Sequence, residues 1–105
     1  MSAKYRVVVT DPADADILEI AAYIATDNED TALPWLADMQ VKVDSLAKFP
    51  TRAPTIPEAP DLGTDLRHLL HGNYRAIFRI DGDQVIILRV VHASRLLDAT
   101  LLSEG

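Results

Sequence analysis

Residues 65–95 have the sequence DLRHLLHGNYRAIFRIDGDQVIILRVVHASR, and this stretch decides the fold. Two turn signals divide it, Gly72-Asn73 and Asp81-Gly82-Asp83, where glycine and asparagine tolerate the positive φ of short turns. Between the turns, apolar side chains recur with the two-residue period of a strand that has one apolar face. The residues of this face are Tyr74, Ala76, Phe78 and Ile80.

An apolar run from Val85 to Val91 follows the second turn. It is apolar on both faces except at Arg89, which is typical of a strand in the interior of a sheet. Leu66 to Leu70 predicts a shorter and more exposed strand before the first turn. The three strands predict a meander with arginines spread across it, and the upstream part of the chain must cover its apolar face.

The upstream part begins with a predicted strand, Lys4–Thr10 (KYRVVVT), which we expect to pair with Val85–Val91. A helix should begin at Asp11-Pro12, with Asp11 as N-cap and Pro12 at the first helical position. It should end near Asp27-Asn28. Its apolar stripe comprises Ala13, Ile17, Ile20, Ala21 and Ile24.

A second helix should run from Asp30-Thr31 to Phe49, with Pro34 in its first turn and Pro50 as its stop. The short link between the helices predicts an antiparallel hairpin. We therefore expect an α+β fold of order β-α-α-β-β-β, in which a mixed, mainly antiparallel sheet carries the hairpin on one face. The apolar stripe of this helix is Ala32, Leu36, Met39, Val43 and Leu46, with Trp35 and Phe49 beside it.

Two segments lack a regular pattern. Thr51–Thr64 contains Pro54, Pro57, Pro60 and Gly63 and predicts an irregular loop. Ala93–Leu102 should form a short helix or an extended tail, and its leucines require burial on this chain or on a partner.

The length, the composition and the net charge of the chain limit the class of protein. A chain of 105 residues fits a single domain spanning residues 1–105, and it contains no cysteine, which fits a reducing cytoplasm. We see neither a signal peptide nor an apolar run long enough to span a membrane. The formal net charge of −6 argues against a protein that works by gripping nucleic acid phosphates. The acids concentrate from Asp11 to Asp65 and the basic residues from Arg67 to Arg95, so a local positive surface stays possible.

Several segments together carry a family resemblance: ADADILEIAAYIA after a first strand, ALPWLADMQVKVDSLAKFP as a second helix, and then LRHLLHGNYRAIFRI and QVIILRVVHASR. Their order and spacing, together with Arg67, Tyr74-Arg75 and His92-x-x-Arg95, resemble the RelE/ParE superfamily of toxin–antitoxin toxins, also called plasmid stabilisation proteins. The resemblance implies the β-α-α-β-β-β fold and a cognate antitoxin that wraps the toxin. It implies one of two targets, since RelE-like members cut mRNA in the ribosome and ParE-like members poison DNA gyrase.

The pattern of an RNA-cutting site is incomplete in this chain. Under the RelE-like alternative, the catalytic candidates are Arg67, Arg75, His92 and Arg95, as cations around the phosphate and a general base. The segment Thr51–Asp65, where RelE-like members carry lysines, has Arg52 as its one basic residue, and no tyrosine follows Arg95. His92 ends an apolar strand on the side of Ile86, Leu88 and Val90, so we expect a structural or partner-contacting role for it.

A binding role predicts a different set of residues. Arg75 and Arg79 share a strand face with Arg67 on a neighbouring strand, which gives either a solvated face near Asp81 and Asp83 or a positive patch for a partner. His68 and His71 should be solvated turn residues, and we expect neither a metal site nor a cofactor. The acids Asp11, Asp14, Asp16 and Glu19 are expected to serve capping and solvation. The candidate target- or antitoxin-binding residues are Trp35, Arg67, Arg75, Arg79, Arg95, Leu96 and Leu97.

The sequence thus predicts a ParE-like, cytoplasmic growth-inhibiting toxin that binds and inhibits DNA gyrase and is neutralised by an antitoxin. One alternative is a RelE-like, ribosome-dependent mRNA endonuclease with an altered site. The other is an inactive interaction module that retains the toxin fold. If the chain is a gyrase-binding toxin, we expect it to have no catalytic activity. We also expect no contact with a membrane, and contact with nucleic acid only indirectly or through the antitoxin complex.

Overall fold

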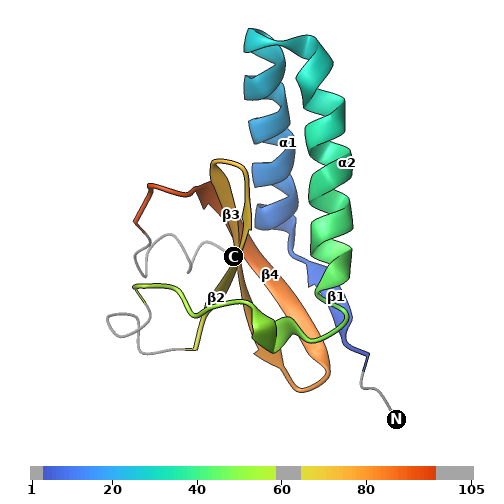
Figure 1. Ribbon diagram of the computed structural model, residues 1–105, viewed down its shortest axis with the longest axis vertical. Coiled ribbons are helices and arrows are strands. Elements are labelled where there is room, and N and C mark those ends of the chain that lie inside the picture. The colour runs from blue at the N-terminus through green and yellow to red at the C-terminus, as the bar shows by residue number, and fades with distance from the viewer. Residues whose placement is uncertain (1–3, 59–64, 97–105) are drawn as a thin grey trace.

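The computed structural model describes residues 4–58 and 65–96. Its elements follow the predicted order, with a helical hairpin beside a four-stranded sheet (Figure 1). The elements are β1 (Arg6–Val9), α1 (Asp11–Asp27), α2 (Glu29–Ser45), the short 3-10 helix η1 (Pro50–Arg52), β2 (Arg67–His71), β3 (Tyr74–Asp81) and β4 (Gln84–His92).

The sheet has the strand order β1-β4-β3-β2. β2, β3 and β4 form the predicted antiparallel meander, and the two turns contain Gly72 and Gly82 at φ values of 58° and 61°. β1 pairs in parallel with β4, with Val7 opposite Val85, which confirms the predicted pairing. A parallel pair requires a long crossover connection, and here the crossover includes the helical hairpin.

The N-cap of α1 lies one residue earlier than predicted. Thr10, and not Asp11, is the N-cap: its hydroxyl oxygen accepts a hydrogen bond from the Ala13 amide at 3.3 Å. The same hydroxyl donates to the Ile87 carbonyl at 2.7 Å, so it also attaches the start of the helix to β4. Asp11 is exposed and lies in the first turn, where its charge favours the helix dipole.

α2 differs from the prediction at both ends. It begins at Glu29, with Asn28 as N-cap, so Pro34 lies inside the helix and not in its first turn. It ends at Ser45 instead of Phe49. The residue before a proline is disfavoured in the α region, and Phe49, which precedes Pro50, takes the left-handed conformation with φ 52°. Phe49 is 72% exposed and does not belong to the apolar stripe.

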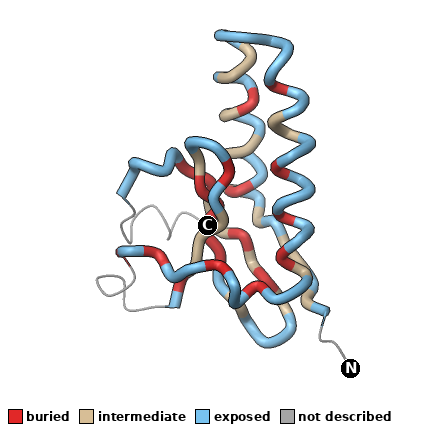
Figure 2. Tube along the Cα trace, viewed as in Figure 1, coloured by how far each residue is buried: buried red, intermediate tan, exposed pale blue. Residues whose placement is uncertain are grey.

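The main core lies between the hairpin and one face of the sheet (Figure 2). Ala13 of α1 and Met39 and Val43 of α2 are buried there, together with Leu46 just beyond α2, and this confirms the two predicted stripes in outline. The sheet contributes Ala76, Phe78, Val85, Ile87 and Val90.

A second, smaller core, which we did not predict from the sequence, lies on the opposite face. It comprises Ile56, Leu66, Ile77 and Val91, with Leu88 packed against them. Its cover comes from the predicted irregular loop, whose described part holds η1 and a bridge between Thr55 and Arg67. The Ile56 amide donates to the Leu66 carbonyl at 2.9 Å. Residues 59–64 of this loop lie outside the described residues.

A bulge in β4 connects the two cores. Ile77 pairs with Arg89 and Phe78 with Ile87, so Leu88 has no opposite residue on β3. Beyond the bulge the side chains exchange faces: Val90 belongs to the main core, whereas Leu88 packs against the second one. The prediction that Leu88 and Val90 share one side was therefore wrong.

Candidate functional site

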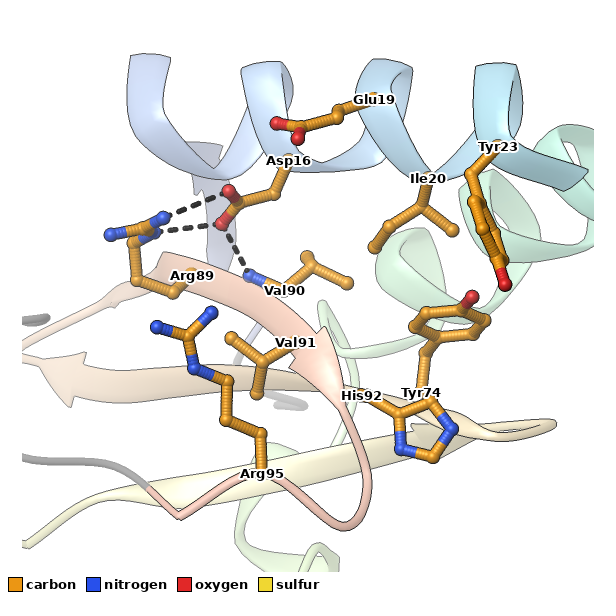
Figure 3. Close-up of a pocket in the computed structure, with 10 residues that line it drawn as sticks. All are labelled: Asp16, Glu19, Ile20, Tyr23, Tyr74, Arg89, Val90, Val91, His92 and Arg95. Atoms are coloured by element: carbon orange, nitrogen blue, oxygen red, sulfur yellow. Dashed lines mark hydrogen bonds and ion pairs between the residues drawn. The ribbon is translucent and has the colours of Figure 1, made fainter.

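An open hollow of about 300 Å³ lies between α1 and the C-terminal end of β4 (Figure 3). One wall is helical, the other comes from the end of the sheet, and the turn after β4 closes the lower side. We call this hollow the α1–β4 groove. It is lined by Asp16, Glu19, Ile20, Tyr23, Tyr74, Arg89, Val90, Val91, His92 and Arg95.

Asp16 forms the inner end of the groove because β1 is shorter than β4. The last residue of β1, Val9, pairs with Ile87, so within the described residues the rest of β4 has no strand on that side. There the Asp16 carboxylate accepts the Val90 amide at 3.0 Å and, in a bidentate pair, Nε and Nη2 of Arg89 at 2.7 and 2.9 Å. The prediction that Asp16 serves only capping and solvation was wrong, because this carboxylate fixes the free edge of β4.

A row of rings forms the outer end. Tyr74 meets His92 edge-on, with ring centroids 5.4 Å apart, and meets Trp35 of α2 edge-on at 5.6 Å. Such edge-to-face pairs hold the rings at fixed angles. Tyr23 of α1 faces Tyr74 across the groove, with the two hydroxyls pointing toward one another (Figure 3), and it is 69% exposed.

The row continues into a second hollow of about 570 Å³ at the tip of the hairpin. It shares Tyr23 and Tyr74 with the α1–β4 groove and adds Trp35 and Asn73. His71 closes the row: it is buried, its ring lies 5.3 Å from Trp35, and its Nε2 donates to the Trp35 carbonyl at 3.2 Å. His71 is thus a structural support and not the solvated turn residue that we predicted.

Arg95 brings a cation to the groove from the turn after β4. Its side chain runs past Val91 toward Arg89 (Figure 3), and the residue is exposed. His92 is also exposed, and its Nδ1 lies 2.7 Å from the Ser94 hydroxyl. Leu96 is 78% exposed, and Leu97 lies outside the described residues.

The three sheet arginines named by the sequence do not form one patch. Arg67 is partly buried, and its Nη1 donates to the carbonyls of Thr51 and Ala53 at 3.2 and 2.7 Å, so it holds the loop. Arg79 is exposed and forms a loose pair with Asp81 at 3.4 Å. Exposed pairs of this kind contribute little to stability.

Arg75 is the third of these arginines and is 3% exposed. It forms a bidentate ion pair with buried Glu58, donates from Nη2 to the Arg95 carbonyl at 2.7 Å, and lies 3.2 Å from Nδ1 of His68. Burial lowers the pKa of His68 and the charge of Arg75 lowers it further, while Glu58 acts in the opposite direction. Arg75 therefore does not lie on the solvated face that was one of its two interpretations, and His68 is half-buried and not the solvated turn residue that we predicted.

Some site residues were named in advance and others were missed. The structure brings Trp35, His92 and Arg95 to one region and separates Arg67, Arg75 and Arg79 from it. Tyr23 was missed, although it follows Asp16 by two helical turns and so shares its helix face. Glu58 was also missed, because a glutamate in a proline-rich loop has no periodic signal.

Two further findings concern the described residues alone. Within residues 4–58 and 65–96, no three His, Asp or Glu side chains lie together in a way that could hold a metal ion. None of the helices in this part of the chain is long and apolar enough to cross a membrane.

The mixed four-stranded sheet with a crossover hairpin is the RelE/ParE-like fold. Within it, a family model described as ParE toxin of type II toxin-antitoxin system, parDE, matches residues 7–97, and the chain belongs to this family. No curated protein matches the sequence.

Two solved structures are similar to this chain. The chromosomal ParDE toxin–antitoxin system from P. aeruginosa aligns with a TM-score of 0.70 and 21% identity, over 89% of this chain and 100% of that one. The toxin–antitoxin complex RelBE2 from Mycobacterium tuberculosis aligns with a TM-score of 0.60 and 26% identity, over 88% and 95%. The first likeness concerns the fold alone.

Proposed function

We propose that this ParE-family chain inhibits growth by binding DNA gyrase and that a cognate antitoxin neutralises it. The observation that carries the proposal is the burial of Arg75, the cation at the centre of the sheet. A cleavage site needs such a cation beside the scissile phosphate. Here Glu58 neutralises it in the interior, which favours a protein that acts by binding.

The other candidates for RNA cleavage fit that chemistry poorly. Arg67 is committed to two loop carbonyls, and of the four catalytic candidates His92 and Arg95 are the ones exposed in the groove. The described part of the segment that would supply lysines contributes to the cover of the second core, and Glu58, which is buried there, is an acid. A net charge of −6 also opposes docking on ribosomal RNA. The mRNA endonuclease is therefore the weaker alternative.

The α1–β4 groove has the composition of a protein-binding surface. Exposed tyrosines offer a large contact area with a polar tip, and such residues with arginine dominate the binding energy of many interfaces. Exposed Tyr23 and Arg95 and half-buried Tyr74 supply this combination, and the Asp16–Arg89 pair and the ring row fix the walls of the groove. A few rigid anchors and one charge for orientation suit a binding toxin.

The antitoxin is proposed from two supports. Both similar structures are described as toxin–antitoxin systems or complexes. The hairpin also exposes large apolar side chains that a partner would cover, namely Leu18, Leu33 and Val41. This surface lies on the helices and is separate from Arg95.

Induction of the chain without its antitoxin tests the proposal. We expect growth arrest, inhibition of gyrase supercoiling by the purified chain, and no codon-linked cuts in mRNA by primer extension. Tyr74→Ala and Arg95→Ala should weaken both effects. Arg79→Ala is the matched control, since Arg79 is an exposed sheet arginine outside the groove.

The alternatives predict other outcomes of the same experiment. Cuts in the ribosomal A site would favour the endonuclease. A soluble, folded chain that leaves both growth and gyrase unaffected would favour the inactive interaction module.

A further inference from the structure

The cover of the second core consists of two segments that are distant in the sequence. One is the loop that carries Ile56 and Glu58, which are buried. The other is the turn after β4, residues 93–96, which returns toward β3. Arg75 of β3 bonds both: its guanidinium pairs with both carboxylate oxygens of Glu58 and donates to the Arg95 carbonyl at 2.7 Å.

The turn after β4 has little apolar surface to hold it. Residues 93–96 are all exposed, so hydrophobic burial contributes little to its position. Its bonds are polar: the Ala93 amide donates to the Asn73 carbonyl at 2.7 Å and the Arg95 amide to the His92 carbonyl at 2.9 Å. The bond from Arg75 ties the turn to a buried and charged donor, and charge-assisted bonds are stronger than neutral ones.

Glu58 makes this bond possible. An unpaired guanidinium would not stay buried at this position, because removing a charge from water is costly unless it is paired. Glu58 occupies one side of the planar guanidinium and leaves an Nη2 hydrogen directed at the Arg95 carbonyl. The planar guanidinium holds the Glu58 carboxylate and the Arg95 carbonyl in fixed directions at the same time, which a lysine ammonium does not do.

We propose that Arg75 is a positioning residue of the α1–β4 groove. It does not touch a target. Arg75 clamps the backbone of Arg95, which lies 20 residues further along the chain. The clamp thereby places the Arg95 side chain at the groove. The clamp itself follows from the geometry, whereas its effect on growth inhibition rests on the function proposed above.

A purely structural ion pair would behave differently from a clamp, and one double variant separates the two. A buried ion pair replaced by apolar residues of similar volume commonly keeps or increases stability. The variant Glu58→Leu/Arg75→Met therefore should fold, but it lacks any donor to the Arg95 carbonyl. Arg79→Met, on the same strand but exposed and distant from the turn, is the matched control.

Three quantities are measured on the purified chains: the unfolding temperature, amide hydrogen exchange by NMR, and growth inhibition after induction. For the double variant we expect an unfolding temperature close to that of the wild type. The amides of Ala93 and Arg95 should exchange on the order of tenfold faster, while the Val90 amide in β4 stays protected. Growth inhibition should fall. Arg79→Met should leave the unfolding temperature, the amide exchange and the growth inhibition unchanged.

Each result decides the proposal. Unchanged exchange at Ala93 and Arg95 overturns the clamp. Faster exchange with undiminished growth inhibition overturns the positioning role. If the wild-type chain does not inhibit growth, the proposed function fails, and exchange alone then decides the clamp. If the double variant does not fold, Arg75→Lys is measured in the same way. This variant keeps the positive charge but lacks the planar guanidinium.

Discussion

The two faces of the sheet are both apolar, but their covers differ in kind. A helical hairpin covers one face, and the buried side chains that pack there are apolar apart from His71. A loop and a turn cover the other, and a buried ion pair, Glu58–Arg75, lies among them. A helix satisfies its own backbone groups, whereas a loop needs bonds from elsewhere. Arg75 serves the loop-covered face as a donor to a backbone carbonyl, whereas Arg67 bonds the loop from the position opposite Phe78 of the main core.

The α1–β4 groove opens where the two covers meet. Asp16, Tyr23, Tyr74 and His92 line it from the helix-covered side, and Arg95 comes from the turn that belongs to the other cover. A site at such a junction can be rigid in one wall and adjustable in the other. The predictions below test whether the two faces differ in this way.

The largest effect is expected from a matched pair of leucines. Leu46 is buried in the main core and Leu66 in the second one, at almost equal exposure. Leu→Ala in a core costs about 2–5 kcal/mol of unfolding free energy, and the cost is lower where the surroundings can collapse into the cavity. We expect Leu46→Ala in the upper half of this range and Leu66→Ala in the lower half, measured by denaturant unfolding. Equal losses would contradict the proposed difference in rigidity.

The next effect concerns the edge of β4 on the helix-covered side. Asp16→Ala removes the bidentate carboxylate that accepts from Arg89 and the acceptor of the Val90 amide, so we expect a loss of about 1–3 kcal/mol. Asp14→Ala is the control, since Asp14 is exposed on the same helix. If both variants unfold at the same denaturant concentration, the Asp16 carboxylate does not stabilise this edge.

A smaller effect, a gain in stability, is expected at Phe49, where the chain passes from the helix-covered face to the loop-covered face. Phe49 occupies the left-handed region with φ 52° and is mostly exposed. Asparagine tolerates this conformation better than a bulky side chain, so Phe49→Asn should raise the unfolding free energy by up to about 1 kcal/mol. Thermal unfolding checks this, with Phe49→Ala as the control for loss of the ring. A lower stability for Phe49→Asn than for Phe49→Ala would contradict it.

The smallest effect is a pH dependence on the loop-covered face. Burial and the neighbouring Arg75 lower the pKa of His68, so the folded chain binds this proton less readily than the unfolded chain. Stability from this residue is therefore present above the unfolded pKa of about 6.5 and is lost as the pH falls below it. The difference in unfolding free energy between wild type and His68→Gln should shrink on acidification. The same experiment with exposed His92→Gln is the control, and an equal slope for both would remove the special role of His68.

The sequence predicted the elements that rest on periodicity. Alternation in residues 74–80 and the apolar run of β4 gave the strands, and the stripes of α1 and α2 gave the hairpin. The boundaries of the helices differed from the prediction, because a cap depends on which side chain reaches the first turn. Thr10 took that role from Asp11 since its hydroxyl also reaches the Ile87 carbonyl of β4.

The candidate site was predictable only in part. Trp35, His92 and Arg95 stand out by residue type and position, and they do lie at or beside the groove. The roles of the sheet arginines were not predictable, because strand alternation gives a face and not its cover. The bulge at Leu88 adds a further change of face that no two-residue pattern contains.

The sequence by itself determined the order of elements, the pairing of β1 with β4 and the apolar side of each helix, because these follow from local periodicity and from turn chemistry. Only the tertiary structure decided which charges are buried. Glu58 and Arg75 are 17 residues apart, and Asp16 and Arg89 are 73 apart. Whether such a pair meets depends on how loops and helix ends close over the sheet, and that closure depends on packing of the whole chain and not on any local pattern.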